Sequence, residues 1–103
     1  MKTLACLIAG LGLLLAVNPA WARKPHPGAE LAGRLGCFAC HSLAGRGGTT
    51  ASGLDGLGSQ LLPDQIEKIL LQPRMHNPQA RMPSYPQLRP HELQSLINYL
   101  MRL

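Results

Sequence analysis

Two cysteines and a histidine form the most chemically informative motif of the sequence. They occur in the run Cys37-Phe38-Ala39-Cys40-His41, with two residues between the thiols and the histidine directly after the second thiol. In an exported protein this spacing is typical of the attachment site of c-type haem. The two thiols can add to the two vinyl groups at the porphyrin edge, and the histidine then lies where it can bind the iron. The motif therefore predicts one haem c, covalently bound through Cys37 and Cys40, with His41 as an axial ligand.

Three other uses of a Cys-x-x-Cys pair fit this sequence less well. A thiol oxidoreductase needs a strand before the motif and a thioredoxin-like sheet, whereas the preceding residues 29–35 have the pattern of a short helix. A structural zinc site normally has four ligands, and no second Cys or His pair occurs at a suitable spacing. A disulfide between the two cysteines would close too small a loop to stabilise a fold. Haem attachment is the interpretation that explains the histidine as well.

The N-terminal segment predicts export. Lys2 precedes an uncharged run from Thr3 to Val17, which is shorter than the roughly 20 residues that a membrane-spanning helix needs. Asn18-Pro19 ends this run, and Ala20-Trp21-Ala22 has the A-x-A pattern of a signal-peptidase site. An uncleaved membrane anchor is the alternative, and the length of the run disfavours it. We therefore expect a signal peptide over residues 1–22, secretion to the periplasm, and a single domain over residues 23–103.

Composition limits that domain to a small and thin core. The chain has 103 residues with 4% aromatic side chains, and it contains 11 glycines and 9 prolines. Cleavage after Ala22 would remove Lys2 and lower the net charge from +5 to +4. This length excludes a multidomain enzyme and a Rossmann-type enzyme. The scarcity of aromatic residues indicates that something besides side chains fills the interior.

The elements that must position the motif are three predicted helices joined by long loops. Helices are expected over about Ala29–Leu35, Asp64–Leu71 and Pro90–Arg102. The last of them has apolar residues at the i, i+3, i+4, i+7 spacing of one helix face, namely Leu93, Leu96, Ile97 and Leu100. No strand is convincing. The glycine-rich segment 45–58 predicts a long loop, which makes sense if it wraps a large apolar cofactor.

Together these segments resemble a small class I c-type cytochrome of the bacterial periplasm. The resemblance covers residues 28–103 and is carried by the attachment segment Gly36–Leu43, the loop Leu54–Gly58, the Met-Pro loop Arg81–Pro86 and the closing helix Leu93–Leu103. It implies an all-α cytochrome c fold, in which about three helices and long loops surround one covalently bound haem.

The resemblance also implies a second axial ligand. Met82 stands at the Met-Pro position of that family, and Pro83 restricts Met82 to extended conformations that can hold its thioether against the far face of the haem. Met101 falls in the last turn of a predicted helix, where packing is the expected role. We favour Met82 over Met75 and His76, which lie in the same proline-rich stretch.

Two positions depart from the pattern of the family. Many relatives carry an aromatic residue on the first helix where this chain has Ala32 and Gly33. We therefore expect a close approach of the first and last helices, with Tyr99 filling the gap. Relatives also often have Gly-Pro where Ala51-Ser52 stands here. A backbone carbonyl at this place is still expected to accept a hydrogen bond from His41.

The function implied by the resemblance is that of a soluble, monomeric electron carrier of the periplasm. The sequence shows no set of residues for acid, base or nucleophilic catalysis, so we do not expect an enzyme. Histidine and methionine ligation would favour ferrous iron and raise the reduction potential. The alternatives are a gas-binding or sensing haem protein with a labile Met82, and a dedicated cytochrome subunit of a dehydrogenase or oxidase.

Charge suggests which partners such a carrier would meet. Arg74, Arg81 and Arg89 surround the Met-Pro loop, and a positive rim there would steer redox proteins with acidic docking surfaces. A scatter of solvated charges is the equally weighted alternative. We expect neither nucleic acid binding nor stable membrane insertion once the signal peptide is removed. Both His26 and His91 are expected to be solvated.

Overall fold

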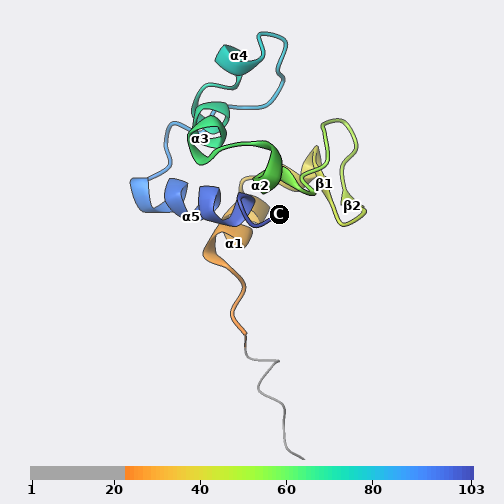
Figure 1. Ribbon diagram of the computed structural model, residues 1–103, viewed down its shortest axis with the longest axis vertical. Coiled ribbons are helices and arrows are strands. Elements are labelled where there is room, and N and C mark those ends of the chain that lie inside the picture. The colour runs from red at the N-terminus through yellow and green to blue at the C-terminus, as the bar shows by residue number, and fades with distance from the viewer. Residues whose placement is uncertain (1–22) are drawn as a thin grey trace, which may run out of the picture.

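The computed structural model describes residues 23–103, and helices form its framework (Figure 1). The elements in chain order are α1 (Pro27–Arg34), the 3₁₀ helix η2 (Cys37–Ala39), β1 (Ser42–Leu43), β2 (Arg46–Gly47), α2 (Leu57–Gln60), α3 (Pro63–Leu71), α4 (Pro73–His76) and α5 (Pro90–Leu100). The three expected helices are confirmed as α1, α3 and α5, and each end lies within two residues of the expected one. The expected signal peptide lies outside the described residues. Within residues 23–103, no helix has the length and apolar character needed to cross a membrane.

The expectation that the chain contains no strand is wrong in one place. β1 and β2 form an antiparallel hairpin that pairs Ser42 with Gly47 and Leu43 with Arg46. Ala44 and Gly45 connect them with φ values of 51° and 77°. Positive φ at both connecting residues is the geometry of a tight hairpin turn. Strands of two residues are too short to show the alternation of apolar and polar residues by which strands are recognised.

Local sequence explains where the helices begin. The first residue of α1, α3, α4 and α5 is proline, whose fixed φ suits a helix start and whose missing N–H is not needed there. In α3 the Leu62 amide donates to Gln65 Oε1 at 2.8 Å, and in α5 the Arg89 amide donates to Glu92 Oε1 at 3.1 Å. These bonds satisfy an amide that the helix itself leaves without a partner.

The first helix is capped by a histidine that we expected to be solvated. His26 Nδ1 accepts a hydrogen bond from the Gly28 amide at 3.0 Å. Its ring lies 5.8 Å from the ring of Tyr99, measured between centroids. His26 is half-buried as a result. It is therefore part of the packing between α1 and α5, whereas His91 is exposed as expected.

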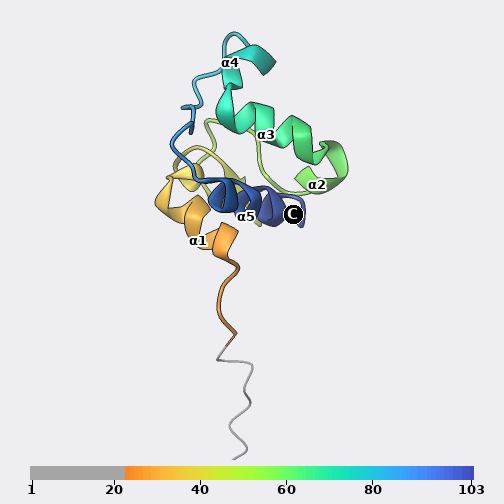
Figure 2. The same cartoon turned by 90° about the vertical axis from the view of Figure 1, so that its left-hand side faces the viewer.

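α1 and α5 pack closely, as Figures 1 and 2 show. Ala32 is fully buried in this contact, at 0% exposure. The two backbones approach closely at Gly28, where an added Cβ would overlap the Ser95 carbonyl and lie 2.5 Å from Tyr99 Cβ. Gly33 is exposed and has no atom within 4 Å of such a Cβ. The expected close approach is thus confirmed for the pair of helices, but it occurs one helical turn before Ala32 and not at Gly33.

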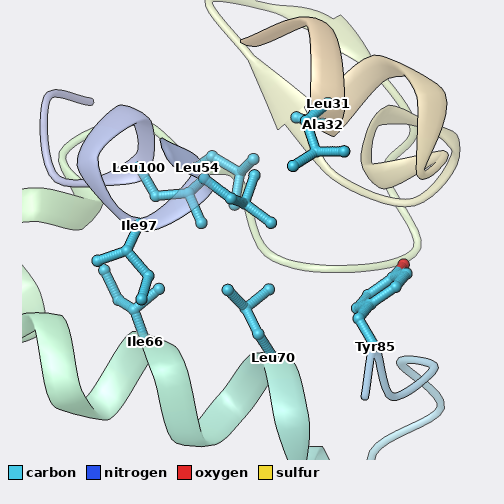
Figure 3. Packing of buried hydrophobic residues seen from close by; sticks show 9 residues of the cluster. Leu31, Ala32, Leu54, Ile66, Leu70, Tyr85, Ile97 and Leu100 are labelled. Atoms are coloured by element: carbon cyan, nitrogen blue, oxygen red, sulfur yellow. The ribbon is translucent and has the colours of Figure 1, made fainter. Parts of the chain in front are cut away.

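The buried core joins α1, α3 and α5 to two loop residues (Figure 3). Its members are Leu31, Ala32, Leu54, Ile66, Leu70, Tyr85, Leu96, Ile97 and Leu100. Figure 3 shows Ile66 of α3 close to Ile97 of α5, with Leu70 beside them and Tyr85 further along. A single aromatic side chain belongs to this cluster, which agrees with the thin core expected from composition.

Candidate haem site

The attachment motif is a single tight turn that places both thiols on one side. Gly36 precedes it with φ 78°, a left-handed conformation that glycine adopts without strain. The amides of Cys40 and His41 both donate to the Cys37 carbonyl, at 3.3 and 3.0 Å. Side chains three residues apart on a 3₁₀ turn eclipse one another. The turn therefore points the sulfurs of Cys37 and Cys40 in similar directions, as two bonds to one porphyrin edge require.

The two thiols differ in burial. Cys37 is half-buried, Cys40 is exposed, and neither is in a disulfide. Burial raises the pKa of the Cys37 thiol, and a hydrogen bond from its own backbone amide opposes this only in part. The surroundings of Cys37 are therefore less polar than water, which suits the thioether that attachment of haem forms.

His41 is oriented by a backbone carbonyl. Its Nδ1 lies 2.6 Å from the Ser52 carbonyl oxygen. Because a carbonyl can only accept, this contact requires the proton on Nδ1 and leaves the lone pair of Nε2 free for a metal. The carbonyl expected within Ala51-Ser52 is thus present, although the Gly-Pro pair of many relatives is absent.

The glycine-rich loop is fastened to the attachment motif. The Gly48 amide donates to the Phe38 carbonyl at 2.9 Å, and the Ala51 amide donates to the Cys40 carbonyl at 3.0 Å. A Cβ on Gly48 would overlap the Ala39 carbonyl, so only glycine permits this approach. These ties fix the position of the Ser52 carbonyl relative to His41.

Met82 lies in a short strap, residues 82–85, that packs on the core. Met82 itself is half-buried against the hydrophobic cluster. In contrast, Met75 is 81% exposed, and His76 beside it on α4 is exposed as well. Of the three residues considered for the second axial position, Met82 alone touches the core of the described chain.

Tyr85 ties this strap to the attachment segment. Its amide donates to the Leu70 carbonyl at 3.0 Å, and its hydroxyl donates to the Leu35 carbonyl at 3.4 Å. Leu35 lies two residues before Cys37. Burial raises the pKa of Tyr85. The role of Tyr85 was missed in the sequence, where the available signal was its place in the Met-Pro loop, directly before Pro86.

The three arginines around the Met-Pro loop do not have equal surroundings. Arg89 Nε pairs with Glu92 Oε1 at 3.0 Å, which raises the pKa of Arg89 and lowers that of Glu92. Arg74 donates to the Met82 carbonyl at 3.4 Å and to Ser84 Oγ at 3.2 Å. Arg81 is exposed and has neither an ion pair nor a side-chain hydrogen bond within residues 23–103.

The donor set fits a porphyrin-held iron. Within the described range, no three His, Cys, Asp or Glu side chains are grouped so that they could hold a metal ion by themselves. The chain instead offers two free thiols on one turn and an imidazole whose Nε2 is available. Such a set is too small for a protein-only metal site, but it suits a haem whose ring supplies the remaining ligands.

Comparison with protein families agrees with this geometry. The family model described as Cytochrome c matches residues 26–103, which is most of the chain. Comparisons with curated proteins and with solved structures returned no match. The mostly helical architecture is that of the cytochrome c fold, and its family binds haem c through the two cysteines of this motif. The chain therefore belongs to the cytochrome c family and binds haem c covalently through Cys37 and Cys40.

Proposed function

We propose that the protein is a soluble, monomeric electron carrier of the periplasm, with His41 and Met82 as the axial ligands of its iron. Electron transfer is the general role of the cytochrome c family, and its members are not generally enzymes. The observation that carries the proposal is the strap of Met82, which Tyr85 ties to Leu35 beside the attachment segment. A strap held in this way favours an iron whose second axial position is filled by Met82 over an iron with an open axial position that could bind a gas.

When bound, the haem supplies a one-electron couple, and the chain tunes and insulates it. The Ser52 carbonyl fixes the His41 ring and increases the basicity of its Nε2. The Met82 thioether is a soft donor that favours the ferrous state and raises the potential. Pro83 keeps Met82 extended, and the half-buried position of Met82 limits the access of water.

The partners that we propose are redox proteins with acidic docking surfaces. Arg74 and Arg81 are exposed and have no carboxylate partner within residues 23–103, so their charges face such a partner, whereas Arg89 is paired with Glu92. The positive rim is therefore smaller than the sequence suggested. Exposed charges of this kind speed encounter more than they tighten binding.

Absorption spectra of the protein matured in a periplasm test the ligation. We expect the ferric parent to be low-spin with the charge-transfer band of a methionine–iron bond, and Met82→Ala to lose that band and to have a lower reduction potential. Met75→Ala is the matched control and should keep both. A ferric parent that is high-spin, and whose ferrous form binds carbon monoxide without displacing a ligand, would instead support the gas-binding alternative.

A further inference from the structure

We propose that Arg74 is a positioning residue for Met82: its guanidinium holds the strap so that the thioether stays at the iron. This inference rests on the proposed ligation by Met82. Arg74 itself is exposed, and it acts through the backbone of the strap.

The contacts of Arg74 bracket the ligand. Nη1 donates to the Met82 carbonyl and Nη2 donates to Ser84 Oγ, so one planar group reaches both sides of Pro83. Within residues 23–103, neither acceptor has another hydrogen-bond donor. A lysine cannot reproduce this, because an ammonium is a compact point charge without the fixed fork of a guanidinium.

The backbone that carries Arg74 is held in place by burial and by packing against α3. Pro73, directly before it, is among the most buried residues of the described chain. α4 follows α3 after one residue and packs against it, and the Asn77 amide closes its single turn by donating to the Pro73 carbonyl at 2.9 Å. Hydrogen bonds from Arg74 therefore restrain the strap relative to α3, which carries the core residues Ile66 and Leu70.

Without Arg74, hydrogen bonds would hold the strap at its C-terminal end only. Tyr85 secures the C-terminal end through Leu70 and Leu35. The N-terminal end leads into the mostly exposed residues 77–81, whose turn is closed within itself by bonds to Asn77. Loss of the Arg74 bonds would therefore leave Met82 restrained at this end only by its packing on the core.

The expected consequence is easier displacement of Met82 from ferric iron, which binds a thioether less well than ferrous iron does. Long hydrogen bonds at an exposed site have a modest net value, so we expect exogenous imidazole to bind ferric Arg74→Leu roughly fivefold more tightly than the parent. The reduction potential should fall as well, because the ferrous state loses more from a weakened thioether bond.

The experiment is an imidazole titration of the ferric holoprotein, with spectra and potentials of each variant. Arg81→Leu is the matched control, because it removes the same charge next to Met82 without removing a hydrogen bond seen in the described chain. It should bind imidazole as the parent does. Arg74→Lys keeps the charge and should restore the parent affinity only in part. Ser84→Ala should give a smaller increase, and adding it to Arg74→Leu should change little further.

The outcomes separate this inference from the proposed ligation. If the ferric parent has the methionine–iron band and Met82→Ala loses it, ligation stands. Imidazole affinities of Arg74→Leu equal to those of the parent or of Arg81→Leu would then overturn the positioning role alone, and so would full rescue by Arg74→Lys. If the parent lacks the band and Met82→Ala leaves its spectrum unchanged, both the ligation and the positioning role are wrong.

Discussion

Replacing Gly28 by alanine tests the contact between α1 and α5. In a helix, alanine is normally more stable than glycine by about 0.5–1 kcal/mol, because glycine has more conformational freedom in the unfolded chain to lose on folding. At Gly28 the added Cβ would overlap the Ser95 carbonyl and lie 2.5 Å from Tyr99 Cβ, so the helices must separate. Overpacking of this kind costs about 1–3 kcal/mol. The net expectation is a loss of about 1–2 kcal/mol, or a melting temperature lower by roughly 4–8 °C per kcal/mol for a domain of this size.

Gly33→Ala is the control on the same helix, because its Cβ would meet no atom within 4 Å and the residue is exposed. We expect this variant to be as stable as the parent or about 0.5 kcal/mol more stable. The free energies of unfolding of both variants are measured by thermal and denaturant unfolding of the holoprotein, with the circular dichroism of the helices as the signal. Equal stability of the two variants would refute the reasoning, since helix propensity alone would then account for both.

Four further measurements follow from the site and its surroundings. Mass spectrometry of the exported protein should show a chain that begins at Arg23 and carries one haem; two alkylatable cysteines would contradict attachment. Replacement of both Cys37 and Cys40 by alanine should leave a largely unfolded chain, because the haem supplies much of the core, and cooperative melting without haem would show this to be wrong. Burial raises the pKa of Tyr85 above its usual 10.0, so above about pH 10 the folded state keeps a proton that the unfolded state loses. The free energy of unfolding should therefore decrease as the pH rises beyond about 10, and Tyr85→Phe should lack the contribution of Tyr85 to this decrease. The rate of electron transfer to an acidic partner should decrease as the salt concentration rises, and it should be lower in Arg81→Glu than in the parent while the absorption spectrum stays unchanged. A rate that does not depend on salt would indicate that Arg81 is only a solvated surface charge.

The helical frame was predictable because each long helix has strong local signals. Proline begins α5 and its apolar face repeats at helical spacing, so Pro90–Leu100 agrees closely with the expected range. The attachment motif was predictable because the spacing of two thiols and a histidine is set by the porphyrin and hardly depends on the rest of the fold. The carbonyl partner of His41 was predictable in place from the resemblance, which put it within Ala51-Ser52.

Contacts between distant segments were not predictable. The tight approach at Gly28 depends on which face of α1 meets Ser95, and the sequence placed it at Ala32 and Gly33 instead. His26 looks like a solvated residue in a frayed segment until the ring of Tyr99 is seen beside it. The pairing of Arg89 with Glu92 is a local contact, three residues apart, that the sequence analysis did not consider, and it changes the charge available to a partner.

The glycine-rich segment has a consequence for how the length of this chain can vary. Surface loops normally accept insertions and deletions, and a stretch such as Thr49-Thr50, exposed on a bend, would be the usual place for them. Here the amides on either side, Gly48 and Ala51, are bonded to the carbonyls of Phe38 and Cys40. One added residue would shift the next carbonyl out of register with the imidazole of His41, which we propose as an axial ligand, and would leave the ring without this orienting partner. If His41 binds the iron as proposed, we expect the number of residues between the hairpin and Ser52 to be a determinant of the redox properties of the haem.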